Sequence, residues 1–212
     1  MLKSNPRWLG AFIVLTIVSA TCYGLIHTYL VQSTLAHLPP TATNVDKQMV
    51  ANSLNQELPV KLAFFPIRVF IGWAAFSLTL FYLCKAFTPR DPIRFSQIFS
   101  LEVHSEATSV IASLVVAVLT LSNPTMNTGP ASMPLSILNF TDQDQSFILK
   151  TLLSSLNVFA LWQILILSVG ASVFCEYGKI KSALIVVLAW AFSILFNVAT
   201  LKLVQDELHL LL

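Results

Sequence analysis

Glutamates in the middle of the chain are the residues whose type and spacing could do chemistry. Glu102 and Glu106 are four residues apart, which puts both carboxylates on one face of a helix. Glu176 is expected at the same cytoplasmic level, and three carboxylates together could bind a cation or relay protons. His104 is offset by two residues from both glutamates, about 200° around the helix, so no metal site is expected. Salt bridges to nearby cations are a simpler explanation of these charges: Arg90, Arg94 or Lys179.

Arg68 is a basic residue within a long apolar stretch. A charge in the hydrocarbon of a membrane costs at least about 2.5 kcal/mol, so this side chain needs a partner, water or access to an interface. Its acidic partners on the same side would be Glu57, Asp142 or Asp144. The alternative is that the long side chain snorkels to the external interface, because Pro66 can begin a fresh turn close to that surface.

Asn157, Gln163 and Asn197 are amides in the last two apolar stretches. Lipid offers no hydrogen bonds, so each amide is expected to bond to a neighbouring helix. Such bonds contribute about 0.6 kcal/mol on average, which favours a role in packing. Asn157 and Asn197 are also the amides that a polar transport site would use.

No motif supplies an enzyme's machinery. The sequence has no G-x-S-x-G, no H-E-x-x-H and no glycine-rich phosphate loop. Its three cysteines, Cys22, Cys84 and Cys175, are widely spaced and form no C-x-x-C pair. We therefore expect no catalytic residue, no metal and no cofactor.

The elements that must position these residues are five apolar stretches. The 212 residues are 56% hydrophobic and 10% charged, against about 25% charged in a soluble domain. A transmembrane helix needs roughly 20 apolar residues. The sequence therefore predicts one all-α integral membrane domain, residues 1–212, with a five-transmembrane-helix bundle. The predicted spans are 8–31, 60–87, 107–121, 151–175 and 182–204.

The connections carry signals of their own. An amphipathic helix is predicted at 43–57, capped by Thr43 or Asn44, within the first external loop. Asp91 and Pro92 mark the start of a helix over 92–122 that contains the third span. A cytoplasmic turn is predicted at 88–91 and a second external loop at 123–141. Residues 176–181 are so few that the last two spans must pack as an antiparallel hairpin.

Lysine and arginine residues set the expected orientation, because basic loops stay in the cytoplasm. With the N-terminus inside, seven such residues are cytoplasmic and four are outside. The N-terminus is therefore predicted to be cytoplasmic and the C-terminus extracytoplasmic. The formal net charge of only +2, without a basic run, indicates no nucleic-acid partner.

Several segments resemble the Yip (Ypt-interacting protein) family over nearly the whole chain. Residues 154–162 read Ser-Ser-Leu-Asn-Val-Phe-Ala-Leu-Trp, and a small-residue stretch with Gly170 and a short turn with Lys179 follow. Residues 5–8, Asn-Pro-Arg-Trp, and 94–100, Arg-Phe-Ser-Gln-Ile-Phe-Ser, are similar to the entries of the family's first and third helices. The match is to bacterial-type members.

The resemblance implies five helices with a cytoplasmic N-terminus and an external C-terminus. Eukaryotic relatives bind small GTPases largely through a long N-terminal region, whereas only residues 1–7 precede the first span here. GTPase binding is therefore not expected. Residues 102–106 depart from the family's blander sequence, so a special role or a local adaptation is expected there.

Together these observations predict a non-enzymatic, Yip-like scaffold or accessory subunit in a bacterial inner membrane. Its partners would be the lipid bilayer and another membrane protein, or a second copy of itself. The alternative is a small transporter or channel with a polar site around Arg68. An intramembrane hydrolase is a third hypothesis, for which no motif supplies a nucleophile and its base.

Overall fold

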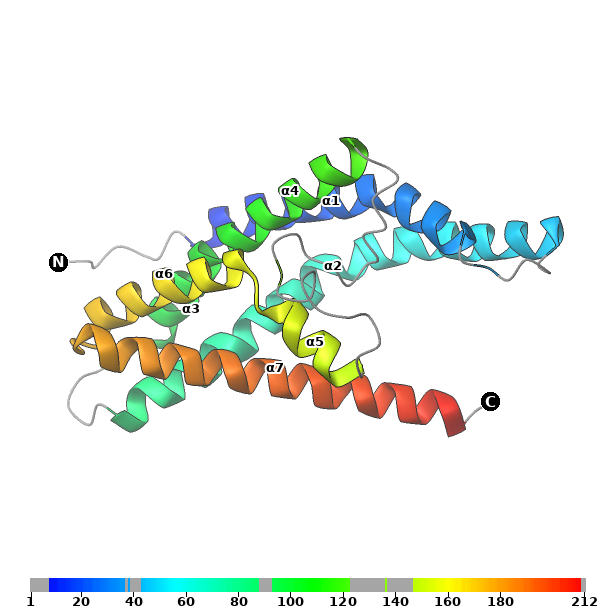
Figure 1. The fold of residues 1–212 in the computed structure, drawn as a ribbon. Coiled ribbons are helices and arrows are strands. Elements are labelled where there is room, and N and C mark those ends of the chain that lie inside the picture. The colour runs from blue at the N-terminus through cyan, green and yellow to red at the C-terminus, as the bar shows by residue number, and fades with distance from the viewer. Residues whose placement is uncertain are drawn as a thin grey trace.

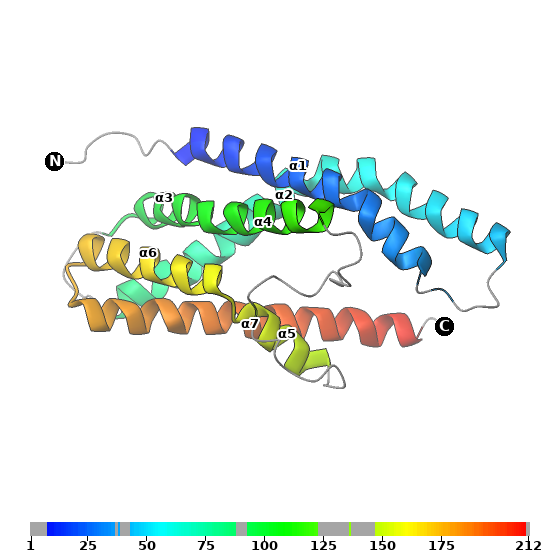
Figure 2. The ribbon, with the colours of Figure 1, turned by 45° about the horizontal axis from the view of Figure 1, so that its top comes forward.

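The computed structural model describes residues 8–36, 38, 43–87, 93–122, 136 and 147–210. These residues fold into helices, with no β-strand among them, so the predicted all-α class is confirmed. Most of these helices run in roughly the same direction, while the second half of α2 and the short α5 cross them obliquely (Figures 1 and 2). Their bounds are α1 Trp8–Ala36, α2 Asn44–Phe87, α3 Phe95–Ser105, α4 Ala107–Ser122, α5 Phe147–Ser155, α6 Val158–Phe174 and α7 Lys179–Leu210.

Four segments are long and apolar enough to cross a membrane, which indicates a membrane protein. They are Trp8–His27, Asn44–Phe87, Phe95–Leu119 and Lys179–Ala199. The predicted third span covered 107–121, whereas the apolar segment of the structure begins already at Phe95. Helix α6, Val158–Phe174, is apolar but shorter.

Helix α2 joins two elements that the sequence suggested were separate. The amphipathic segment 43–57 and the span 60–87 form one helix, with Pro59 and Pro66 inside it. Thr43 caps this helix as predicted: its Oγ1 accepts from the Asp46 N–H at 3.2 Å, and Asp46 Oδ2 accepts from the Thr43 N–H at 2.8 Å.

Two kinds of contact support α2 around its prolines, although each proline removes a backbone donor. Lys61 and Glu57 form an ion pair of 2.7 Å across Pro59. On either side of Pro66, aromatic rings of α1 pack against α2: Tyr23 stacks on Phe65, and Phe12 packs edge-on against Phe70. Packing against α1 therefore outweighs the local preference for a break.

The helix predicted over 92–122 is two helices in line, α3 and α4 (Figure 2). Its predicted cap, Asp91, and the turn 88–91 lie outside the described residues. The structure instead starts α3 after Arg94, whose N–H donates to Gln97 Oε1 at 3.1 Å. The interruption falls at Glu106, where ψ is −10°.

Side chains that bond to their own helix account for this interruption. Ser105 Oγ donates to the Glu102 carbonyl at 2.8 Å, and Thr108 Oγ1 donates to the Ser105 carbonyl at 2.9 Å. His104 Nδ1 bonds to the Ser100 carbonyl at 2.6 Å. Side-chain hydrogen bonds of this kind, to carbonyls of the preceding turn, compete with the backbone hydrogen bonds of a helix and bend it.

The predicted span 151–175 is also divided, into α5 and α6. Asn157 has an extended backbone, with φ −133° and ψ 165°, and its Oδ1 accepts from the Ala160 N–H at 2.9 Å. Asparagine is a strong N-cap because its short side chain reaches the free N–H groups of a helix start. Near the break, Ser136 Oγ donates to the Leu153 carbonyl at 2.9 Å.

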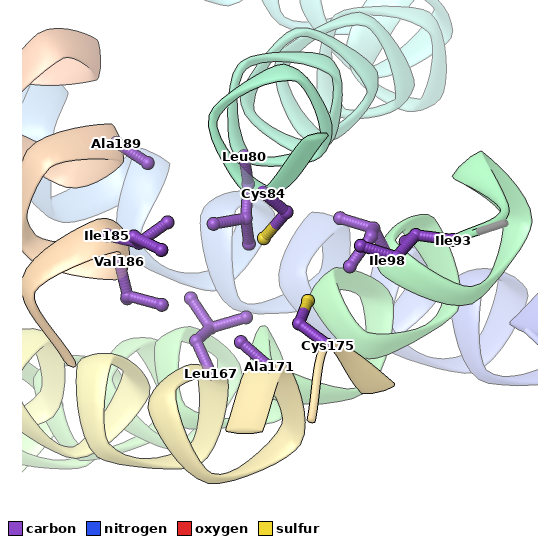
Figure 3. Close-up of a cluster of buried hydrophobic side chains, with 10 residues drawn as sticks. All are labelled: Leu80, Cys84, Ile93, Ile98, Leu167, Ala171, Cys175, Ile185, Val186 and Ala189. Atoms are coloured by element: carbon purple, nitrogen blue, oxygen red, sulfur yellow. The ribbon is translucent and has the colours of Figure 1, made fainter. Parts of the chain in front are cut away.

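Helices α6 and α7 form the antiparallel hairpin that their short connection predicted (Figure 2). They are the most extensively packed pair of helices in the described structure. Helix α7 starts at Lys179 and continues to Leu210, beyond the predicted 182–204. A cluster of buried side chains from α2, α3, α6 and α7, including Leu80, Ile98 and Leu167, joins this hairpin to the other layers (Figure 3).

Candidate functional site

The candidate site lies near the middle of the apolar segment Phe95–Leu119. Its midpoint is Ala107, twelve residues from either end. With a rise of about 1.5 Å per residue, Glu106 is within about 2 Å of that level and Glu102 within about 8 Å. The hydrocarbon core extends about 15 Å to each side of its centre. Both glutamates therefore lie in the central part of this apolar segment.

Glu102 and Glu106 point into the bundle and contact each other. The Glu102 side chain is only 2% exposed, and its Oε2 lies 3.4 Å from Ser105 Oγ, whose proton is donated mainly to the Glu102 carbonyl. Its carboxyl group interacts directly with that of Glu106, which also bonds to Ser109. The i, i+4 spacing is the reason that one helix presents both carboxyl groups to the same neighbours.

Gln163 of α6 completes this site from the other side. Its Nε2 donates to Glu106 Oε1 at 2.9 Å. We refer to Glu102, Ser105, Glu106, Ser109 and Gln163 as the carboxyl site. Gln163 was recognised in the sequence as an amide in an apolar stretch, but its partner is 57 positions away and has no sequence signature.

The carboxyl site can hold a proton between two acids. Adjacent negative charges repel strongly where water is excluded, and one proton shared by Glu102 and Glu106 would remove that repulsion. The amide of Gln163 donates to one acceptor oxygen, and the Ser105 hydroxyl reaches another. Chemically this is a small hydrogen-bonded network that links α3 to α6.

The other predicted site residues lie elsewhere. Arg68 is exposed on α2, Glu176 is exposed after α6, and Asn197 is exposed on α7. Asn157 is the N-cap of α6. The structure therefore brings together only Glu102 and Glu106 of the residues predicted from the sequence.

Arg68 lies on a part of α2 that runs beside α1. Phe65 stacks on Tyr23 and Phe70 packs edge-on against Phe12, so Arg68 is level with the middle of α1, and its side chain is exposed. The snorkelling interpretation stays a prediction. Of its proposed partners, Glu57 is paired with Lys61, and Asp142 and Asp144 lie outside the described residues.

The predicted salt bridges to the glutamates are not formed by the described cations. Arg94 and Lys179 are exposed, whereas Glu102 is buried, and Arg90 lies outside the described residues. A surface hollow of about 400 Å³ is lined by α2 alone: Ser53, Gln56, Glu57, Val60 and Lys61. It lies away from the carboxyl site, so it gives the buried acids no route to water.

Cys84 and Cys175 form a second contact between helices, at the end of the bundle that holds the α6–α7 turn. Their thiols point toward one another within the buried cluster (Figure 3). Tyr177 donates its hydroxyl to the Cys84 carbonyl at 2.7 Å, and burial raises the pKa of Tyr177 to about 12. No group of three metal-ligating side chains gathers among the described residues. These thiols serve as packing groups that fasten the turn to α2.

Comparison of this chain with models of protein families, with curated proteins and with solved structures finds no match.

Proposed function

We propose that this chain is a non-enzymatic, Yip-like membrane protein that serves as a scaffold or accessory subunit for a membrane partner. In this proposal it crosses a bacterial inner membrane five times, with its N-terminus in the cytoplasm. The observation that carries it is the 2.9 Å hydrogen bond between Gln163 and Glu106.

That bond supports a structural role because it uses the side chains of Glu106 and Gln163 to hold two helices together. Intramembrane carboxyl groups of a conduction path would line a wet cavity, whereas here Glu102 is 2% exposed and Glu106 is bonded to α6. The residue around which a transport site was predicted, Arg68, is exposed on another helix. These positions fit best a rigid helix bundle whose outer surface binds a membrane partner.

Isolation of the intact complex tests the proposal. The full chain, tagged and extracted in several mild detergents, should co-purify with one membrane protein in a fixed ratio. Two measurements are needed: the masses of the native particle and the ratio of its components. A monomer from every extraction would contradict the accessory role.

Proton or cation binding is a second candidate function, favoured by the contact between Glu102 and Glu106. It predicts that vesicles containing the protein change internal pH or take up a monovalent cation faster than empty vesicles. The double variant Glu102→Gln and Glu106→Gln should abolish that excess, while Glu176→Gln, at an exposed acid, should leave it unchanged. Equal rates in protein-containing and empty vesicles would reject this candidate.

A further inference from the structure

Cys84 and Cys175 belong to separate elements and meet inside the protein. Cys84 lies in the last turn of α2, and Cys175 ends α6. Their side chains are hydrogen-bonded to each other, and Figure 3 shows the two sulfur atoms facing one another within the buried cluster. The two cysteines are far apart in the chain, so only the fold places them together.

Neighbouring contacts hold the two cysteines in this position. Tyr177, two residues after Cys175, donates its hydroxyl to the Cys84 carbonyl at 2.7 Å. Lys181 Nζ donates to the Phe87 carbonyl at 3.2 Å and lies 4.5 Å from the centroid of the Tyr177 ring. The turn between α6 and α7 is therefore fastened to the end of α2 by two further contacts, which keep the two thiols within reach of each other.

A disulfide is the chemistry that suits such a pair. Two thiols are too few for a structural zinc site, which needs four ligands, and no group of three metal-ligating side chains gathers among the described residues. Cys22 provides the contrast, because it is also buried but lies on α1, where its thiol interacts with no other cysteine of the described structure. The fold thus makes one pair and one single thiol.

We propose that Cys84 and Cys175 form a reversible disulfide that locks the turn between α6 and α7 to α2 when the cell is exposed to hydrogen peroxide. This inference does not depend on the proposed accessory function. The predicted orientation puts this end of the bundle in the cytoplasm, where disulfides are mostly transient and redox-sensing. A cellular dithiol then reduces the bond and releases the turn.

Cys175 is the thiol that the peroxide meets first, because it adjoins the exposed Glu176, whereas Cys84 is completely covered. Having lost its proton, Cys175 Sγ attacks one peroxide oxygen; the O–O bond breaks, a sulfenic acid forms, and the departing hydroxide takes up that proton as water. Cys84 Sγ then attacks the sulfenic sulfur, the S–O bond breaks, and a second water leaves with the Cys84 proton. The two thiols give up two electrons, which reduce one hydrogen peroxide to two waters.

Thiol counting on the full chain in native membranes tests the pair without any substitution. A maleimide polymer added after denaturation labels each free thiol, so the reduced protein carries three labels. Hydrogen peroxide applied before denaturation should leave only Cys22 labelled, and dithiothreitol should restore all three labels. Mass spectrometry should find one peptide pair joined through Cys84 and Cys175, lighter than the two separate peptides by two hydrogen atoms.

Serine variants separate the roles of the cysteines. Cys22→Ser should form the cross-link as the wild type does, and Cys175→Ser should form none. Cys84→Ser should stop at the sulfenic acid of Cys175, which dimedone traps. Oxidation should raise the midpoint of thermal unfolding of the wild type by on the order of 10 °C, because the bond closes a long loop, and should not raise that of Cys175→Ser.

Several results would overturn the proposal. Three labels after peroxide treatment would show that the pair does not react, and equal loss of all three thiols would show that oxidation is unselective. Disulfides between separate copies of the chain would show that the two cysteines find other partners first. An unchanged or lowered unfolding midpoint in the cross-linked wild type would reject the lock even if the bond forms.

Discussion

Polar side chains of this protein differ in whether they form hydrogen bonds to another helix. Arg68 and Asn197 are exposed, and among the described residues neither side chain holds two helices together. Near the middle of the apolar segment Phe95–Leu119, Glu106 Oε1 accepts a hydrogen bond from Gln163 Nε2 at 2.9 Å. The reason is that hydrocarbon provides no hydrogen bonds, so a side chain too deep to reach water needs a protein partner.

Removing the donor of the carboxyl site should therefore destabilise the bundle. Gln163→Leu leaves the Glu106 carboxyl without its interhelical donor, and we expect a loss of about 1 to 2 kcal/mol in the free energy of unfolding. Denaturant unfolding in detergent micelles measures it. Asn197→Leu is the matched control, because that amide is exposed. Equal losses in both variants would contradict the structural role of the bond.

A local backbone strain follows α6. Glu176 has φ 53°, the left-handed region that suits glycine and costs other residues about 1 to 2 kcal/mol. Glu176→Gly should therefore raise the free energy of unfolding by about 1 kcal/mol, measured in the same micelles. Glu176→Ala keeps the side-chain clash and removes only the charge, so it should change little. Stabilisation by alanine equal to that by glycine would assign the effect to charge instead.

Helices in this fold are divided where side chains compete with the backbone ladder. Asn157 supplies a cap that starts α6 afresh, and Ser105 and Thr108 back-bond around the interruption at Glu106. Proline inside a helix usually kinks or ends it, but α2 continues through Pro59 and Pro66. Packing and capping between elements therefore decide helix boundaries that composition alone would place differently.

Close packing of α6 on α3 depends on Gly170. A Cβ atom there would lie 2.6 Å from Leu101 Cδ2 and closer still to Cδ1. Gly170→Ala should lower the free energy of unfolding by about 1 to 3 kcal/mol, because the Leu101 side chain must leave its rotamer or the two helices must separate. Leu101→Ala in the same chain should restore part of that loss, since it removes the clashing atoms.

Gly72 is the control for this substitution. It is also helical, but a Cβ atom there meets nothing within 4 Å. Gly72→Ala should be neutral or stabilising by up to about 1 kcal/mol, because alanine has the higher helix propensity. Similar losses at both glycines would show that helix contact at Gly170 is not the cause.

Across the whole molecule, the number of crossings depends on α6. Its 17 residues span about 26 Å, slightly less than the hydrocarbon thickness of about 30 Å. It nevertheless pairs along α7, whose apolar segment Lys179–Ala199 is long enough to cross. If both helices of this hairpin cross, the chain has five spans and its termini face opposite sides.

Reporter fusions at the two ends measure this topology. A fluorescent protein that matures only in the cytoplasm should be active at the N-terminus, and an alkaline phosphatase active only outside should work at the C-terminus. The physical reason is the excess of lysine and arginine in the predicted cytoplasmic segments. Termini on the same side would indicate an even number of spans, with α6 not crossing.

The sequence alone determined the features that depend on local spacing. Long apolar stretches predicted membrane helices, Thr43, one of the two expected caps, starts α2, and the four-residue separation of Glu102 and Glu106 put both acids on one face. The short connection before α7 required a hairpin. Each of these follows from geometry within a few residues, so no knowledge of distant contacts was needed.

Only the tertiary structure decided which faces meet. No sequence pattern pairs Gln163 with Glu106 or Leu101 with Gly170. The sequence also predicted Glu176 beside the two acids, whereas Glu176 is exposed after α6. Apolar residues surround most of these helices, so their periodicity does not mark an inner face. The rotation and register of each helix are then set by side-chain packing and by rare polar contacts, which exist only once the bundle has formed.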